Sequence, residues 1–307
     1  MNGLVLIDKP LDCTSHDIVL GLRKILSEPH IGHFGTLDPM ASGLLVAALG
    51  KAARFFPFFS KENKSYEGRI RLGQATDTYD AQGTALAAPT RELPDEAVLR
   101  RAMAKYFGQI QQVPPPFSAK KFQGKPFYKI ARSGGEPPRV PSPVFIHGFE
   151  LVAYDPPDAD IKVTCSAGTY IRSLAHDLGR DLGCGGHLTR LRRTRCGGYS
   201  VEQALTIEQV RELAASGRAE SAVIPLEALL TDFRRVDLTE SDSRLARNGR
   251  SLPLEEGPAG PYQSPGPSDL DKGEPVFMRM FNPEGRLIAL AKWDAGLKTL
   301  HPFLVLE

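Results

Sequence analysis

The feature that most constrains the fold of this chain is a loop, GHFGTLDP at residues 32–39, in which one acid lies among glycines and a proline. Asp38 precedes the proline, so its backbone is pushed toward extended conformations, and the glycines permit a tight turn or a close ligand. The apolar run at residues 44–49 predicts the start of a buried helix that would hold the loop rigid. A carboxylate on a rigid loop suits a nucleophile or general base. Helix capping by Asp38 is the simpler alternative, and spacing alone favours it.

The overall composition is typical of a water-soluble globular protein with room for one large or two ordinary domains. The chain has 307 residues, of which 41% are hydrophobic and 24% are charged. No apolar run reaches the length of a membrane span, and the N-terminal residues lack the basic region of a signal peptide. We therefore expect a cytoplasmic protein that makes no membrane contact.

The cysteines indicate neither disulfides nor a metal centre. Four of them are scattered without a Cys-x-x-Cys pair, so reduced thiols are expected. Cys184 lies three residues before His187, a spacing found in metal sites, but further ligands are missing and no metal is expected. The chain also lacks a Walker loop and a Gly-x-Gly-x-x-Gly motif, so the sequence does not predict a nucleotide cofactor.

Positive charge is concentrated locally, although the formal net charge is only +2. One basic cluster falls at residues 120–139, where Glu136 is the only acid and aromatic residues are interleaved. A second falls at residues 190–195, with four arginines and no acid. Such clusters suit phosphate neutralisation combined with base stacking. A solvated loop with basic decoration is the alternative, and the residues alone leave both interpretations open.

Hydrophobic periodicity predicts helices and strands along most of the chain. Helices are expected at residues 15–26, 94–107, 169–182 and 206–215, with Ser15 and Thr206 as N-caps. Strands are expected at residues 3–7, 66–72, 144–153 and 161–165. Residues 113–143 lack periodicity and are rich in proline, glycine and lysine, which is typical of a functional or mobile segment. A composition break near residues 231–237 precedes a tail in which residues 254–274 predict a flexible loop.

Several motifs together resemble one known family. Residues 32–43 fit the pattern Gly-His-x-Gly-x-Leu-Asp-Pro-x-Ala-x-Gly at every defined position, and this is the catalytic motif of the TruB family of bacterial tRNA pseudouridine-55 synthases. Other stretches resemble the family's remaining motifs in the same order: LIDKP at 6–10, KSYE at 64–67, RLGQATDT at 71–78, VPP at 113–115, GTYIRSL at 168–174 and LRRT at 191–194. The resemblance covers residues 3–205.

The resemblance implies an α+β fold with two domains. Residues 1–232 would form a pseudouridine synthase catalytic domain around a large mixed, mostly antiparallel sheet. An insertion at about residues 117–143 would grip the RNA. Residues 233–307 resemble a small β-rich PUA-like RNA-binding domain, with strands expected at 276–281, 285–291 and 301–306.

The resemblance assigns catalysis to three residues. Asp38 would act on the ribose or the base, Arg172 would pair with Asp38, and Tyr66 would stack on the uracil. An arginine suits this role because it favours the charged carboxylate where water is excluded. Without the family, Arg172 would be interpreted as part of a surface ion pair and Tyr66 as an ordinary strand aromatic. Tyr170 would point to a different side of the predicted helix from Arg172.

The family also implies contacts that open the RNA, because a base inside a folded loop is unreachable until it is extruded. His33 would fill the vacated stack, Lys9 would brace the catalytic loop, and Asp80 would support the same polar network. Tyr170 and Leu191 would pack against the base. The other expected RNA contacts are basic residues: Lys120, Lys121, Lys125, Arg192 and Arg193.

The function implied is a stand-alone tRNA pseudouridine-55 synthase, an isomerase that flips a uridine of the T loop. The isomerisation needs no redox change and no group donor, so no cofactor is expected. The expected partner is tRNA, without an obligatory protein partner, and a monomer is expected. Tyr79 departs from the family, in which small polar residues are common at that position, and would alter the pocket wall.

Three alternatives use the same features. Guide-RNA-dependent synthases carry similar motifs, but they resemble this family with the basic insertion reduced. A non-catalytic RNA-binding protein or RNA chaperone fits the basic clusters, but does not explain an intact set of Asp38, Tyr66 and Arg172. A phosphatase motif at residues 80–84 lacks its second aspartate, because Gln82 stands there.

Overall fold

The computed structural model describes residues 1–118, 120–253 and 276–306, and the chain divides into two compact units. The larger unit consists of Val5–Ala48 and Phe55–Ala222. The smaller unit consists of Met1–Leu4, Leu49–Arg54 and Val223–Glu307. The flexible loop predicted at residues 254–274 lies outside the described residues.

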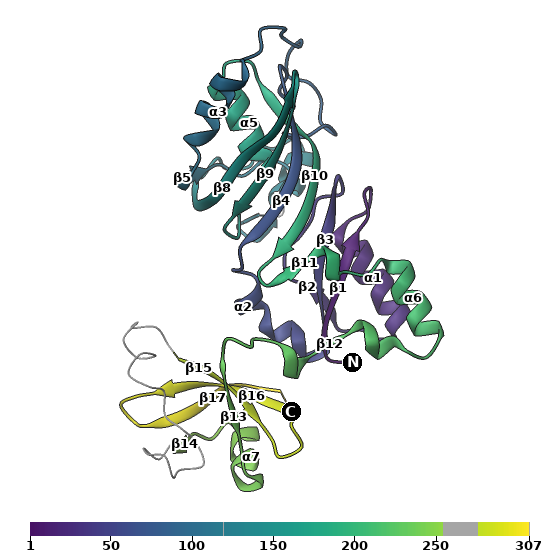
Figure 1. The fold of residues 1–307 in the computed structure, drawn as a ribbon, viewed down its shortest axis with the longest axis vertical. Helices are drawn as coiled ribbons and strands as arrows, with labels where there is room; N and C mark the ends of the chain where they lie inside the picture. The colour runs from purple at the N-terminus through teal and green to yellow at the C-terminus, as the bar shows by residue number, and fades with distance from the viewer. Residues whose placement is uncertain (119, 254–275, 307) are drawn as a thin grey trace. The chain divides into compact units, whose positions relative to one another are not determined.

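A ten-stranded sheet has the order β12-β1-β3-β10-β4-β9-β8-β5, with β2 paired to β3 and β11 paired to β10 (Figure 1). Its strands are β1 (Gly3–Lys9), β2 (Ile31–His33), β3 (Ala41–Leu49), β4 (Lys64–Leu72), β5 (Gly108–Gln112), β8 (Ser142–Asp155), β9 (Asp158–Cys165), β10 (Gly186–Cys196), β11 (Tyr199–Ser200) and β12 (Ile224–Pro225). β10 runs parallel to β3 and antiparallel to β4, and the pairs from β4 to β5 are antiparallel. The large mixed sheet and the α+β fold class are therefore confirmed.

The helix predicted to begin at residue 44 is wrong, because residues 44–49 belong to strand β3. This strand lies between β1 and β10 in the sheet, and residues 44–49 are buried. A strand covered on both faces is a continuous apolar run, which periodicity cannot distinguish from a buried helix. Gly43 permits the close pairing with β10, because a Cβ there would lie 2.3 Å from the carbonyl oxygen of Arg193.

The longer helices of the larger unit form two pairs that are visible in Figure 1, α1 with α6 and α3 with α5. Their bounds are α1 (Ser15–Leu26), α3 (Glu96–Ala104), α5 (Ile171–Asp181) and α6 (Ile207–Ala215). Thr206 caps α6 as predicted, whereas α1 is capped by Thr14 and not by Ser15. Thr14 is the N-cap residue because it forms a reciprocal capping box with Asp17.

Shorter helices complete the chain. These are α2 (Phe56–Phe59), α4 (Phe127–Arg132), η1 (Gly50–Phe55), η2 (Val201–Gln203), η3 (Ala219–Ala222) and η4 (Leu226–Ala228). Of the helices in the described part of the chain, none has the length and apolar character that crossing a membrane requires.

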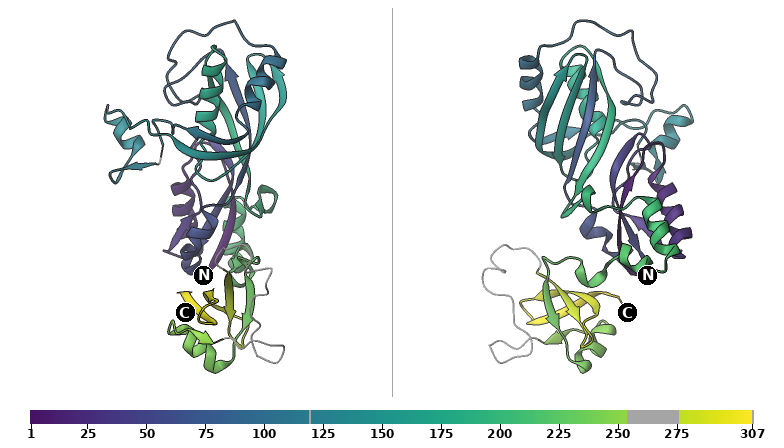
Figure 2. Two further views of the ribbon diagram at one scale, coloured as in Figure 1. Left: turned by 90° about the vertical axis from the view of Figure 1, so that its left-hand side faces the viewer. Right: turned by 45° about the vertical axis from the view of Figure 1, so that its right-hand side comes forward.

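The segment at residues 113–143 has more structure than its sequence predicts. A small hairpin of β6 (Lys121–Phe122) and β7 (Lys125–Pro126) precedes α4. Gln123 and Gly124 turn the hairpin with φ of 48° and 82°, the positive values typical of a tight two-residue turn. This part of the chain projects to one side of the large sheet (Figure 2). Two-residue strands are too short to produce a periodic signal.

The smaller unit contains a five-stranded sheet in the order β13-β15-β16-β17-β14. Its elements are β13 (Arg234–Asp237), α7 (Glu240–Arg247), β14 (Leu252–Pro253), β15 (Phe277–Phe281), β16 (Leu287–Asp294) and β17 (Thr299–Val305). Buried residues from the sheet and from α7, among them Ala246, Met278 and Leu300, form one core. The prediction of a small β-rich C-terminal region is confirmed.

Candidate active site

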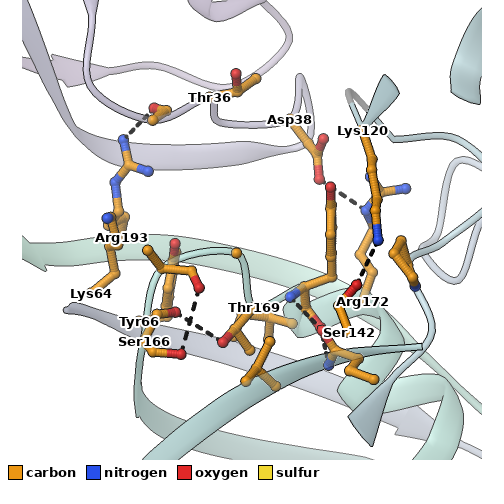
Figure 3. Close-up of a pocket in the computed structure, with 18 of the residues that line it drawn as sticks. Thr36, Asp38, Lys64, Tyr66, Lys120, Ser142, Ser166, Thr169, Arg172 and Arg193 are labelled. Atoms are coloured by element: carbon orange, nitrogen blue, oxygen red, sulfur yellow. Dashed lines mark hydrogen bonds and ion pairs between the residues drawn. The ribbon is translucent and has the colours of Figure 1, made fainter. Parts of the chain in front are cut away.

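A cavity of about 480 Å³ opens in the larger unit, where the loop at residues 35–38 faces the sheet (Figure 3). The other lining residues come from the residue after α2, from β4, from the end of β5 and the residues after it, from the start of β8, from residues 166–172 at the start of α5, and from β10. Five charged residues line it, and only one of them is acidic: Asp38, Lys64, Lys120, Arg172 and Arg193. The cavity therefore carries an excess of positive charge.

Asp38 is held by a loop that is anchored on both sides. Leu37 and Met40 are buried in the main hydrophobic core, so the residues flanking Asp38 are fixed by packing. The Ser15 hydroxyl accepts a 2.8 Å hydrogen bond from the Leu37 amide and donates a 3.0 Å bond to the Leu37 carbonyl. The Asp38 carbonyl accepts a 3.0 Å bond from the Ala41 amide. The Asp38 carboxylate, 35% exposed, lines the cavity.

Arg172 lies in the first turn of α5 and brings two carboxylates together. Its guanidinium is 5% exposed, with Nε 2.8 Å from Asp38 Oδ2 and Nη1 3.3 Å from Asp80 Oδ2. The Asp38 contact is an ion pair in which the N–H is not aligned as a hydrogen bond. Nη1 and Nη2 also donate to the carbonyls of Thr78 and Phe117. Arg172 is thus a buried guanidinium beside a carboxylate of the cavity and not part of a surface ion pair, which was the alternative without the family.

Asp80 lies behind this pair and is only 4% exposed. Its Oδ1 accepts hydrogen bonds of 2.6 Å from the Thr78 hydroxyl and 3.0 Å from the Gln82 amide. Because its other oxygen faces Arg172, the carboxylate is fully engaged. Asp80 therefore orients the guanidinium and does not line the cavity itself.

Gln112 fixes the start of α5 and was not identified from the sequence. Its side-chain amide accepts a 2.8 Å bond from the Tyr170 amide and donates a 3.0 Å bond to the Tyr170 carbonyl. Tyr170 is the N-cap residue, outside the helix, so it lines the cavity together with Arg172 instead of pointing to a different side. A lone glutamine in a strand carries no sequence signal for this function.

Tyr66 lies on β4 with Arg193 directly opposite on β10. Burial raises the pKa of the Tyr66 phenol to about 12, although the nearby Arg193 guanidinium acts to lower it. The phenol is therefore neutral near pH 7. Leu191 also lines the cavity from β10 and is 5% exposed. An aromatic ring and an aliphatic side chain suit the two faces of a planar base.

Arg193 is almost completely buried and donates to two backbone carbonyls. Nε donates to Leu44 over 2.7 Å, and Nη2 donates to Gly35 over 3.0 Å. Lys64, beside it in the cavity wall, donates to the carbonyls of Ser60 and Glu62. Lys64 belongs to the KSYE motif, which is the sequence signal that could have identified it as a site residue. No function was predicted for it from the sequence.

The remaining basic residues predicted to contact RNA occupy different environments. Lys120 lines the cavity and donates a 2.6 Å bond to the Ser142 hydroxyl. Lys125 is exposed on β7. Arg192 forms a two-bond ion pair with Asp8 over 2.9 and 2.7 Å. The side chain of Lys121 lies outside the described part of the structure.

Two other predicted residues lie outside the cavity lining. Lys9 is fully buried and donates to the carbonyls of Pro10 and Cys13, and burial lowers the pKa of its ammonium. His33 ends β2, and its partly buried imidazole has a pKa lowered by burial and by Arg193. Asp38, Tyr66 and Arg172 thus line the same cavity, whereas Lys9 and His33 do not.

The possible metal site is not supported. His187 Nδ1 lies 2.8 Å from the Gln74 carbonyl, and no group of three His, Cys, Asp or Glu residues among those described could hold a metal ion.

Comparison with known families agrees with the motifs. The model described as "TruB family pseudouridylate synthase (N terminal domain)" matches residues 23–171, and "tRNA pseudouridylate synthase B C-terminal domain" matches residues 172–232. The chain is 41% identical over 302 residues to "tRNA pseudouridine synthase B" of Aromatoleum aromaticum, covering 98% of this chain and 92% of that one. The chain belongs to the TruB family of pseudouridylate synthases. A second protein of the same name, from Thermobifida fusca, is also 41% identical and is covered to 96% on both chains.

Solved structures share the fold. A chain of "Crystal Structure of a Cbf5-Nop10-Gar1 Complex" matches with a TM-score of 0.68 and 25% identity, covering 99% of this chain and 84% of that one. A chain of "Structure of H/ACA RNP bound to a substrate RNA containing 2'-deoxyuridine" matches with a TM-score of 0.69 at 23% identity, covering 99% and 85%. The latter likeness concerns the fold alone.

Proposed function

We propose that this chain is a tRNA pseudouridine-55 synthase that isomerises a uridine of the T loop. The observation that carries the proposal is the cavity in which Asp38 pairs over 2.8 Å with the buried Arg172 and in which Tyr66 also takes part. Relatives named tRNA pseudouridine synthase B over nearly the whole chain support it. The enzyme would be an isomerase acting without a cofactor.

The geometry suits the chemistry of this isomerisation. The bond between ribose C1′ and uracil N1 must break, the base must turn, and C5 must bond to C1′. Arg172 pairs with Asp38 and would hold its carboxylate beside the reacting sugar. Tyr66 offers a neutral ring on which the uracil stacks. Leu191 and Tyr170 close the other walls.

The uridine reaches this cavity only after it leaves the RNA stack. We propose that His33 fills the vacated stack and that the basic insertion grips the T loop through Lys120, Lys121 and Lys125. Arg192 would meet the RNA next to its pair with Asp8. Residues 1–232 would form the catalytic domain, and residues 233–307 would bind RNA elsewhere.

The insertion that contains β6, β7 and α4 favours a stand-alone mode. In guide-dependent synthases, which otherwise resemble this family, that segment is reduced. Action without a protein partner, a monomeric state and a cytoplasmic location remain predictions from the sequence.

The test is incubation of the purified chain with unmodified tRNA transcript, followed by mapping of pseudouridine at each nucleotide. We expect one pseudouridine, at position 55, and none in a transcript with cytidine there. Modification at another position would change the proposed substrate, and no modification by the folded protein would contradict the proposal.

A further inference from the structure

The two arginines of the cavity differ in what neutralises them. Arg172 faces Asp38 and Asp80, whereas Arg193 forms no ion pair within the described residues. Arg193 is nevertheless 1% exposed, with Lys64 as its basic neighbour. Burying a charge without an opposite charge is unfavourable in free energy. A buried arginine without an acidic partner therefore suggests that a negative charge is supplied by a bound ligand.

The backbone holds this guanidinium in a fixed orientation. Nε and Nη2 are bound to the carbonyls of Leu44 and Gly35, which lie on either side of Asp38 in the sequence. Nη1 donates to no carbonyl or carboxylate among the described residues. It lies beside Gly35, where φ is 119° and an added Cβ would be 3.4 Å from Nη1. Because glycine has no side chain, there is space next to this nitrogen.

The position of Arg193 relative to Tyr66 indicates which part of a nucleotide would meet it. Arg193 and Tyr66 are directly paired on β10 and β4, so their side chains lie on the same face of the sheet. Figure 3 shows both at one end of the cavity, with Asp38 and Arg172 at the other. A flipped nucleotide enters base first, and a phosphate stays nearer the opening. The buried Arg193 therefore suits the base, while the more exposed Asp38 suits the sugar.

We propose that Arg193 is a catalytic residue that stabilises the negative charge on uracil while the base is detached from the ribose. The inference rests on the proposed function. When the C1′–N1 bond breaks, its electron pair stays with uracil, which becomes an anion spread over N1, O2 and O4. The electron pair of C5 then forms the new bond to C1′, the C5 proton leaves, and N1 takes up a proton. Uridine and pseudouridine are isomers, so no other reactant is required.

A preorganised cation next to a developing anion lowers the barrier because it needs no reorganisation during the reaction. Lys64 strengthens the same field, and the repulsion between it and Arg193 would be relieved when the anion forms. The assignment differs from a phosphate contact, because it predicts an effect on bond cleavage and not on RNA affinity.

The test compares two substrates in single turnover at saturating enzyme. One tRNA carries uridine at position 55, and the other carries 5-fluorouridine, whose fluorine stabilises the detached base as an anion. The rate is the disappearance of the N-linked nucleotide. We expect Arg193→Gln to slow cleavage about 100-fold for uridine and only about 10-fold for 5-fluorouridine. Arg193→Lys, which keeps the charge, should lose less than Arg193→Gln for uridine.

The controls separate this effect from a structural one. Arg69→Met removes an arginine of β4 that pairs with Asp160 outside the cavity, and should leave both rates unchanged. Equal losses on both substrates, or a loss confined to RNA affinity, would overturn the proposal. If Arg193→Gln does not fold, Arg193→Lys decides, because a loss equal for both substrates and above about 100-fold contradicts a charge effect. Inactivity of the wild-type chain on uridine-55 would instead refute the proposed function.

Discussion

The two ends of the cavity show how similar residues acquire different functions. At one end, Arg172 forms ion pairs with Asp38 and Asp80. At the other end, Arg193 donates to backbone carbonyls and has no acidic partner in the part of the chain that the structure describes. If the proposal holds, the charge of Arg172 is balanced before substrate arrives, and the charge of Arg193 is balanced by the substrate. We therefore expect loss of the first end to affect both stability and chemistry, and loss of the second to affect chiefly chemistry.

The largest effect is expected from Asp38→Asn, which removes the charge at the balanced end and keeps the shape. Pseudouridine formation should fall by about 10⁴-fold or more, because no other carboxylate lines the cavity among the described residues. Affinity for tRNA should stay within about twofold, since affinity for RNA depends mainly on cations that meet phosphates and Asp38 is an anion of the cavity. Single-turnover rates and filter binding measure the two quantities.

The control for this variant is Asp158→Asn, which weakens an aspartate–arginine pair, here with Arg71 and with two hydrogen bonds, outside the cavity. Its activity should match the wild type. Residual turnover in Asp38→Asn within tenfold of the wild type would remove Asp38 from the mechanism.

Arg172→Met should combine a loss of activity with a loss of stability. The change leaves Asp80 buried without its cation, which costs about 3–5 kcal/mol in the free energy of unfolding. Chemical denaturation measures this cost. The double variant with Asp80→Asn should recover most of the stability but not the activity, since Asp38 still lacks its partner. Recovery of activity as well would mean that Arg172 acts only through Asp80.

Tyr66→Phe sharpens the comparison through the pH dependence of stability. Burial raises the pKa of Tyr66 to about 12 from an ordinary 10.0, so the folded state favours the neutral phenol. This contribution is complete below pH 10 and is lost as the pH rises through about 12. The variant has no phenol to ionise. Between pH 10 and 12 its free energy of unfolding should therefore fall by about 2 kcal/mol less than that of the wild type. Identical slopes in thermal unfolding between pH 10 and 12 would show that the phenol is not buried in solution.

The smallest effect is expected from Lys125→Met on the exposed hairpin of β6 and β7. Loss of a surface lysine that contacts phosphate should lower tRNA affinity a few-fold. It should also reduce the slope of log affinity against log salt concentration by about 1. The rate at saturating tRNA should not change. Lys24→Met, an exposed lysine of α1, is the matched control. An equal effect of both variants would mean that the insertion attracts RNA no more than any other basic surface.

Local signals succeeded where a short segment contains its own reason for folding. Thr206 and Gln209 satisfy each other's backbone at the start of α6, so the cap is readable from spacing. Ser15 was wrong as a cap because its hydroxyl is bound to Leu37, which is 22 residues away and which no local pattern reveals. The same long-range bond helps to fix the loop that carries Asp38.

What the sequence determined by itself was the family and the mixed fold, because each family motif is a short contiguous segment. The same motifs predicted Asp38, Tyr66 and Arg172 as site residues. Only the tertiary structure decided that residues 44–49 form a central strand, since burial on both faces removes the periodicity that separates strand from helix. It also decided that Arg172, and not Arg193, has acidic partners among the described residues. That difference depends on pairing between β3, β4 and β10, and partners brought together by a sheet leave no spacing in the chain.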